Sequence, residues 1–401
     1  MDPVTHGITG ALLGKGYFSD RCGRVATVAV TLGALFPDVD VFVEAASRDP
    51  LAIIKFHRGI THSFVALPFF AALLAWLTRE FVVRRLKIES PSIVILWLAY
   101  ALGIASHIVL DGMTSFGTRM WSPVSQRRVA WDFLFIIDFS LTSLVLLPQV
   151  AAWIYRDRER SRRRAWLMWL VFSAAAVIVS YLARAAGFPF RMWIVLAASA
   201  IFAVLVFLPS AGGRGFRIAR SAWCRAGVCG TVAYLVACGL AHHAAIQRVQ
   251  NFAAENHIAV DRLAALPLPP SLFSWGGAIR TPDGVYQSRF DLRNPLPPLF
   301  RFSQDSPPDS FIARAMKLPE VQLYWSFARF PVIRSTFENG SHVVEFGENR
   351  FVSRRAQGPK PFTYEVVFDA SGKAMEEGWE SNGLSLRQLR KIRPQRAGGT
   401  P

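Results

Sequence analysis

Apolar runs close to twenty residues long constrain this chain more than any other feature of its sequence. An α-helix needs about 20 apolar residues to cross the hydrocarbon core of a bilayer. Six runs approach that length, at residues 64–83, 93–110, 133–155, 166–186, 192–208 and 226–246. Two shorter runs, 4–18 and 25–36, predict a tight hairpin before them. Hydrophobic residues make up 52% of the chain, which is high for a soluble protein. The sequence therefore predicts a polytopic helical membrane domain over residues 1–246.

Basic residues predict the orientation of these helices. Arginine-rich loops at 84–87, 156–164 and 214–225 separate apolar runs, and the positive-inside rule places such loops in the cytoplasm. The same loops explain much of the net charge of +17, so a nucleic-acid partner is not needed to account for it. The helices then alternate and expose the segment before residue 64, the connection 111–132 and the chain after about 247 on the external side. We expect a bacterial inner-membrane protein.

The chain after residue 246 has a different character. Proline clusters at 267–270, 295–298 and 307–308 punctuate it, and no run is long enough to span a membrane. Segments rich in β-branched and aromatic residues at 284–292, 321–327, 332–337, 342–346 and 362–368 predict strands. The basic residues of 387–396 predict a frayed tail. Residues 247–401 are thus expected to form an external, soluble, β-rich domain on a mainly α protein.

Four of the eight histidines fall within the first 107 residues, each near a turn or helix end: His6, His57, His62 and His107. His107 and Asp111 lie four residues apart, so on a helix they share one face and could hold one ion. Taken alone, that pair fits a hydrogen bond at a helix end equally well. Asp38 and Asp40 follow a proline that stops a helix. One could bind a metal while the other orients a histidine or a water, or both could be solvated.

The topology combines these residues into one site. His57, His62, His107 and Asp111 fall on the same external face, and His6, Asp38 and Asp40 join them if the hairpin turn is cytoplasmic. Mixed imidazole and carboxylate ligands suit zinc, with manganese or iron as alternatives, and the number of ligands allows one or two divalent ions. A metal-bound water supplies hydroxide near neutral pH. The pattern therefore predicts hydrolase chemistry.

Three further residues are assigned catalytic roles. Arg58 lies between two candidate ligands and could bind a phosphate bidentately, although an arginine there also suits lipid head groups. Asp138 is expected inside an apolar helix and Asp132 at the external end of that helix. A buried carboxylate needs a partner. For Asp138 we expect either a metal-bound histidine, which we prefer, or a structural bond to a neighbouring helix.

Five short stretches carry a family resemblance: MDPVTHGITGALLG at 1–14, LFPDVD at 35–40, HRGITHS at 57–63, SHIVLDG at 106–112 and WDFLFIID at 131–138. Together they resemble the membrane-bound metal-dependent hydrolase family that is also called LexA-regulated or YdjM-like. The resemblance implies a membrane metal site without a settled substrate. A remote similarity links the pattern to zinc-dependent phospholipase C, which also uses an N-terminal histidine, an aspartate, another histidine and a His-x-x-x-Asp pair. Its later His and Glu ligands and its N-terminal tryptophan have no evident counterpart here.

The leading hypothesis is a membrane-bound, metal-dependent hydrolase that acts at the external face on phosphoesters of lipids or lipid-linked substrates. Membrane lipids are then its expected partners. The alternative is a non-catalytic metal-binding membrane protein or a transporter. A transporter should line its helices with polar residues at mid-depth, and in this sequence only Asp138 clearly does so.

Overall fold

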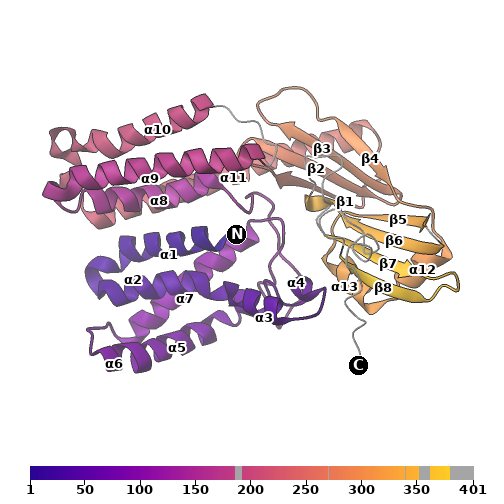
Figure 1. Ribbon diagram of the computed structural model, residues 1–401, viewed down its shortest axis with the longest axis horizontal. Helices are drawn as coiled ribbons and strands as arrows, with labels where there is room; N and C mark the ends of the chain where they lie inside the picture. Colours follow the sequence, from indigo (N-terminus) through magenta and orange to yellow (C-terminus); the bar gives the residue numbers. More distant parts are fainter. Residues whose placement is uncertain (186–191, 270, 339, 352–361, 380–401) are drawn as a thin grey trace, which may run out of the picture.

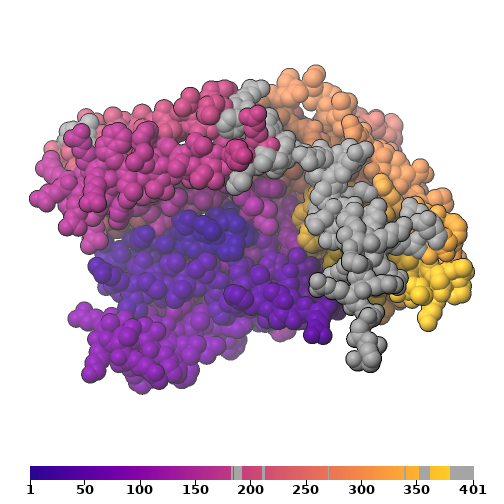
Figure 2. Space-filling model, viewed as in Figure 1, coloured from indigo at the N-terminus to yellow at the C-terminus, as the bar shows by residue number. Residues whose placement is uncertain are grey.

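The protein, seen here in a computed structural model, has a helical part and a part made of two sheets (Figure 1). The structure describes residues 1–185, 192–269, 271–338, 340–351 and 362–379. The helices lie side by side with their long axes roughly parallel, and both sheets stand at one end of them. In the space-filling view the two parts form one continuous body (Figure 2). The predicted fold class, mainly α with a β-rich C-terminal half, is confirmed.

The helical part contains, in chain order, α1 (Pro3–Tyr17), α2 (Ser19–Leu35), η1 (Phe36–Val39), α3 (Asp40–Ala46), α4 (Ala52–Lys55), η2 (Ile60–His62), α5 (Leu67–Leu77), η3 (Thr78–Val83), α6 (Arg84–Leu86), α7 (Ile93–Gly112), α8 (Phe139–Ile154), α9 (Arg158–Ala185), α10 (Met192–Phe207), η4 (Leu208–Arg217) and α11 (Arg220–Glu255). Over the described residues, four helices are long and apolar enough to cross a membrane, and a bent pair that includes α5 would make five. Helices α8 and α10 have 16 residues each and would span about 24 Å.

Close packing of α1, α2 and α7 determines where the ends of these helices lie. Gly33 of α2 and Gly103 of α7 sit at the crossing, where a Cβ atom on Gly103 would lie only 2.3 Å from the Val30 carbonyl oxygen. A Cβ atom on Gly33 would lie 2.6 Å from the Tyr100 carbonyl oxygen. Small residues allow this approach in membrane helices. The C-terminal ends of α2 and α7 are thereby brought together.

The helix predicted over 133–155 starts later in the structure, and this part of the prediction is wrong. Helix α8 begins at Phe139, and Asp138 is its N-cap, accepting hydrogen bonds from the backbone N–H groups of Ser140 and Leu141. An aspartate at this position satisfies amides that have no partner within the helix. Residues 113–138 form instead a long connection, which we call the α7–α8 loop, and Leu134 is buried within it.

Two four-stranded antiparallel sheets make up the C-terminal domain, a name used here for residues 262–379. The first contains β1 (Arg262–Pro267), β2 (Ser274–Thr281), β3 (Gly284–Asp291) and β4 (Phe300–Gln304), and the second contains β5 (Pro331–Glu338), β6 (Ser341–Glu348), β7 (Thr363–Phe368) and β8 (Ala374–Trp379), each in sequential order. Between the sheets lie α12 (Ser310–Ala315) and α13 (Pro319–Phe327), and η5 (Asn349–Phe351) comes after β6.

Four of the five predicted strands are confirmed, within β3, β5, β6 and β7. The strand predicted at 321–327 is wrong, because this segment is helix α13. Pro319 stands at the start of that helix, and the buried residues Val321, Tyr324 and Phe327 recur every third position, as a helix face requires. The basic tail predicted at 387–396 lies outside the described residues.

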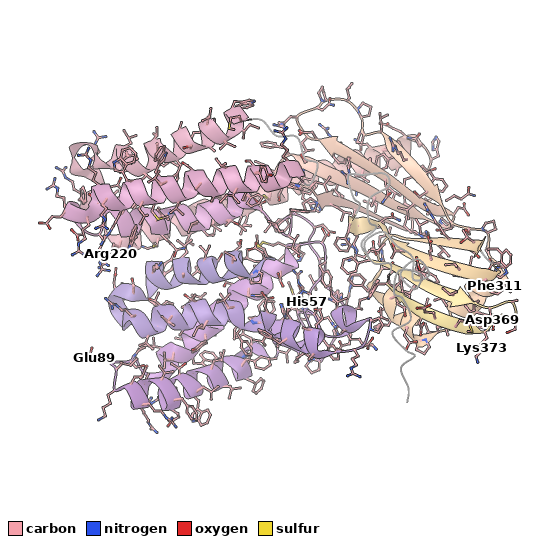
Figure 3. All side chains as sticks on the ribbon, viewed as in Figure 1. His57, Glu89, Arg220, Phe311, Asp369 and Lys373 are labelled. Atoms are coloured by element: carbon pink, nitrogen blue, oxygen red, sulfur yellow. The ribbon has the colours of Figure 1, made fainter. Side chains whose placement is uncertain are left out.

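Helix α11 joins the two parts of the molecule. It continues to Glu255, nine residues beyond the predicted run, and Val249 and Ala253 in its last turns share an apolar core with Trp275 and Ile279 of the first sheet. Arg220 at its start lies at the opposite end of the molecule, as does Glu89, whereas His57 lies at the end that faces the sheets (Figure 3). The described basic loops and the C-terminal domain therefore occupy opposite ends.

Candidate metal centre

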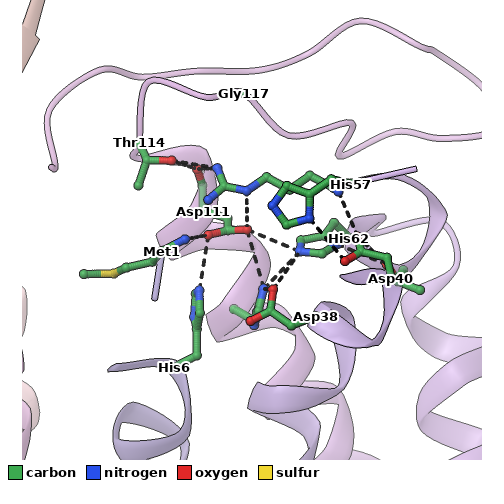
Figure 4. A network of polar contacts seen from close by, with 12 residues as sticks. Met1, His6, Asp38, Asp40, His57, His62, Asp111, Thr114 and Gly117 are labelled. Atoms are coloured by element: carbon green, nitrogen blue, oxygen red, sulfur yellow. Dashed lines mark hydrogen bonds and ion pairs between the residues drawn. The ribbon is translucent and has the colours of Figure 1, made fainter. Parts of the chain in front are cut away.

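Four candidate ligands converge in a network of polar contacts (Figure 4). Asp38 comes from η1, His62 from η2, and His107 and Asp111 from the last turns of α7. Each offers one ligand atom, and these four atoms lie within 4.8 Å of one another. The four segments meet because α2 and α7 are in close contact and because the chain returns through α3 and α4 to η2. The result is a compact group of two imidazoles and two carboxylates.

The hydrogen bonds of the two imidazoles show where their lone pairs point. His107 Nδ1 lies 2.7 Å from the Ala34 carbonyl oxygen, which only accepts, so Nδ1 carries the hydrogen. His62 Nδ1 faces the Asp40 carboxylate at 3.3 Å, which favours the same tautomer. Both Nε2 atoms are then acceptors when the rings are neutral. They lie only 3.0 Å apart, so the two lone pairs face each other unless a proton or a metal cation lies between them.

Two carboxylates complete this group. Asp38 Oδ1 lies 3.4 Å from His107 Nε2 and 3.7 Å from His62 Nε2. Asp111 Oδ2 lies 3.3 Å from His62 Nε2 and 3.5 Å from His107 Nε2. The second oxygen of Asp38 is buried without a hydrogen-bond partner. Buried acceptors that point at one another fit a divalent cation, and the N₂O₂ donor set suits zinc.

Asp40 supports this group from outside. Its Oδ1 lies 3.3 Å from His57 Nδ1, and its Oδ2 accepts a 2.8 Å hydrogen bond from the backbone N–H of Arg58. The same Oδ2 faces His62 Nδ1. One carboxylate therefore orients a proposed ligand and also holds the turn that carries His57. Histidine ligands of metals commonly have such a partner on their other nitrogen.

Arg58 lies directly against the candidate ligands. Its Nε is 2.9 Å from Asp111 Oδ2, and its Nη1 donates to Thr114 Oγ1 at 2.7 Å. The residue is 1% exposed and adopts a positive φ of 55°, which is uncommon for a residue with a side chain. In this geometry Arg58 compensates the Asp111 charge.

His6 lies beside the four-residue group. Its ring stacks on His107 with centroids 3.6 Å apart, and its Nε2 is 3.2 Å from Asp111 Oδ1. The α-amino group of Met1 also contacts Asp111 Oδ1. His6 is fully buried. The Asp111 carboxylate therefore links His6, Arg58 and the two other histidines.

Asp132 and Asp138, to which the sequence analysis assigned catalytic roles, lie elsewhere. Asp132 forms a bidentate ion pair with Arg329 of the C-terminal domain, in which Nη1 and Nη2 donate to the two carboxylate oxygens at 2.8 and 2.7 Å. Asp138 caps α8 and accepts a 2.8 Å hydrogen bond from the Tyr234 hydroxyl. Among the described contacts neither carboxylate meets a histidine of the group. The support expected from Asp138 comes instead from the Ala34 carbonyl and from Asp40.

Sequence reasoning missed several residues that shape the site. The Ala34 carbonyl left no signal, because every residue has one. Thr114, three residues after Asp111, can be inferred from helical spacing once Arg58 is placed. Arg128 of the α7–α8 loop donates to the carbonyls of Ile54 and His57 at 2.8 and 3.3 Å. Burial, together with the neighbouring positive charge of Arg119, lowers the pKa of Arg128 to about 9.

Comparison with protein families finds a similarity within the helical part. Residues 1–187 match the profile of the family described as YdjM inner membrane protein. Comparisons with curated proteins and with solved structures gave no match. The matched region runs from α1 through α9 and contains every candidate ligand. The chain is thus an integral membrane protein whose residues 1–187 are similar to the YdjM inner membrane protein family.

Proposed function

We propose that this protein is a metal-dependent hydrolase whose site lies at the external face of the membrane. Its substrates would be phosphoesters of lipids or lipid-linked molecules. One observation carries the proposal: the Nε2 atoms of His62 and His107 lie 3.0 Å apart between two aspartates. Protonation of one imidazole would also separate these lone pairs, and metal binding would then displace that proton.

The four-residue group fits one divalent ion, with zinc the best match to its donors. A second ion would require His57 and Asp40, which approach each other to 3.3 Å. When bound, such an ion lowers the pKa of its water and polarises a phosphoryl oxygen. The protein's own residues would act by position: Asp40 would orient His62, and we assign to Arg58, which neighbours Asp111, the compensation of charge that develops on the phosphoryl oxygens.

Exposure and location support the substrate class. His57 and Asp38 have side chains that are 19% and 14% exposed, whereas those of His62 and Asp111 are at most 1% exposed. We therefore expect the substrate to approach from the side of Asp38 and His57. The group lies at the ends of α2 and α7, and we expect these helix ends to reach the level of the lipid head groups. A lipid phosphoester would be held there by the bilayer itself.

Burial also favours a rival function. His6, His62, His107 and Asp111 are all fully buried, as in structural zinc sites, which keep no open position. A non-catalytic metal-binding membrane protein would have this property. The two functions differ in turnover and not in metal content.

The test uses purified protein in detergent. His107→Ala and Asp111→Ala each remove a ligand, so we expect elemental analysis to find at least one fewer ion per chain than in the wild type. His243→Ala, a histidine outside the group, is the matched control and should keep its metal. Unchanged metal in both ligand variants would refute the site.

Turnover is then measured with metal-loaded protein in mixed micelles. Phosphodiester, phosphomonoester, acyl-ester and peptide substrates are compared, with His107→Ala as the inactive control. We expect hydrolysis of phosphoesters. Activity confined to acyl or peptide bonds would overturn the substrate class, and bound metal without any turnover would favour the rival.

A further inference from the structure

We propose that the C-terminal domain is a positioning part of the metal centre, which holds the His57–Arg58 turn in place through Phe116 and Arg350. This inference rests on the proposed function and adds its regulation: the site is complete only while the domain is docked. Phe116 belongs to the α7–α8 loop and Arg350 to η5 of the C-terminal domain.

Phe116 contacts both residues of that turn. Its ring meets the His57 ring edge-on, with centroids 5.3 Å apart, and the Arg58 guanidinium lies 5.2 Å from its centroid. The ring also packs on Phe327 of α13, with centroids 5.2 Å apart. The side chain is 7% exposed. Phe116 thus transmits the position of the C-terminal domain to His57 and Arg58.

Arg350 fixes the backbone that carries Phe116. Its Nη1 donates to the carbonyl oxygens of Ser115 and Phe116 at 3.1 and 3.4 Å, and its Nη2 donates to that of Phe327 at 2.8 Å. Arg350 is buried and has Glu348 as its ion-pair partner. Separating the domain from the loop would leave the Ser115 and Phe116 carbonyls without this donor, which is costly unless water reaches them.

Two further contacts anchor the same region. Arg329 forms a bidentate ion pair with Asp132 through two parallel hydrogen bonds, the strongest form of such a pair. Leu51 and Ile54, which precede His57, are buried in one apolar core with Tyr324 and Phe346 of the C-terminal domain. The segment before the His57–Arg58 turn and the α7–α8 loop therefore both pack against the C-terminal domain.

The described contacts of the C-terminal domain reach the His57–Arg58 turn but not the four-residue group. Over the described residues, the hydrogen bonds and ion pairs of Asp38, His62, His107 and Asp111 go to the helical part. A loosened domain should therefore release His57 and Arg58 but leave the four-residue group able to bind its ion. A purely architectural interface would not produce this division.

The experiment uses the full-length chain and two kinds of variant. Asp132→Arg and Arg329→Asp each break the ion pair, and the double variant restores it with the charges exchanged. Phe116→Leu removes the ring but keeps an apolar side chain. Phe368→Leu is the matched control, since Phe368 is buried in the same core but belongs to β7, away from the loop.

Two readouts separate this inference from the proposed function. The first is hydrogen exchange over residues 54–62, where the Arg58 amide donates to Asp40. The single variants and Phe116→Leu should speed this exchange about tenfold, the factor expected for one lost aromatic contact or ion pair. The double reversal should return it to within about threefold of the wild type. This readout remains valid if the protein hydrolyses nothing.

The second readout is turnover beside bound metal. Phe116→Leu should lower kcat for the phosphoester about tenfold, while the ion of the four-residue group stays bound and Phe368→Leu keeps wild-type turnover. Wild-type exchange in all interface variants would overturn the inference. So would loss of the metal together with turnover, because the effect would then not be confined to the turn. Failure of the double variant to recover would exclude the ion pair as an anchor.

Discussion

Asp40 supports the proposed metal site without belonging to the four-residue group. It faces His62 Nδ1, the His57 ring and the Arg58 backbone amide. We expect Asp40→Ala to weaken metal binding about 10- to 100-fold, as losses of such outer partners do. A competition titration against a chelator measures this affinity. Asp20→Ala, at the other end of α2, should leave the affinity unchanged.

An equal loss in both variants would mean that Asp40 acts only through the overall charge. The same titration at several pH values adds a second check. Protons compete with a metal for the imidazole lone pairs, so the affinity should fall as the pH is lowered. If Asp40 fixes the His62 tautomer, Asp40→Ala should bind more weakly at neutral pH as well.

At this scale the sequence predicted the candidate residues better than their individual roles. The structure places all seven proposed metal residues in or against one group, because helical spacing and chain turns are visible in the sequence. The roles of Asp132 and Asp138 were not visible, since each depends on a partner far along the chain, Arg329 or Tyr234. The Ala34 carbonyl can accept a hydrogen bond from His107 because it is one of the last four carbonyls of α2. Such carbonyls have no partner within their own helix.

Among the helices, the contact between α2 and α7 controls the site most directly. Gly103→Leu would force these helices apart, since even a Cβ atom there approaches the Val30 carbonyl to 2.3 Å. We expect loss of bound metal, because Asp38 and the Ala34 carbonyl would move away from His107. The variant should also be less stable by about 1–3 kcal/mol, the usual cost of overpacking.

Elemental analysis and thermal unfolding in detergent test both effects. Gly239→Leu in α11 is the control, because a Cβ atom there meets nothing within 4 Å. It should keep its metal and its unfolding temperature. A Gly103→Leu protein with full metal content would show that the ligands do not depend on this crossing.

Long apolar helices were predictable, whereas several strands and helix ends were not. Strands β1 and β2 contain Ala264, Ala265, Gly276 and Gly277, which have low β propensity, so pairing and burial decide their structure. The sequence of α13 predicts a strand because its aromatic and β-branched residues are found in strands as well as in helices. The start of α8 depended on Asp138 as a cap within an apolar run.

For the whole molecule, the arrangement predicts opposite sides for its two ends. The described basic loops gather at the end away from the sheets. We expect a reporter fused after Arg160 to report the cytoplasm and one fused after Gly284 to report the external side. Paired alkaline phosphatase and fluorescent protein fusions measure this. Reports from the same side for both positions would mean that the helix count is wrong by one.

Helix α11 fixes a dimension of the molecule. Its 36 residues extend about 54 Å, well beyond the ~30 Å hydrocarbon core, and its last turns are built into the first sheet. One residue inserted in the middle of α11 would rotate the C-terminal domain by about 100° around the helix axis and shift it by about 1.5 Å along that axis. Arg329 would then miss Asp132. Even a pair of turns, about seven residues, would shift the domain by about 10 Å along the axis, so the length of α11 should be fixed during evolution while surface loops remain free to change.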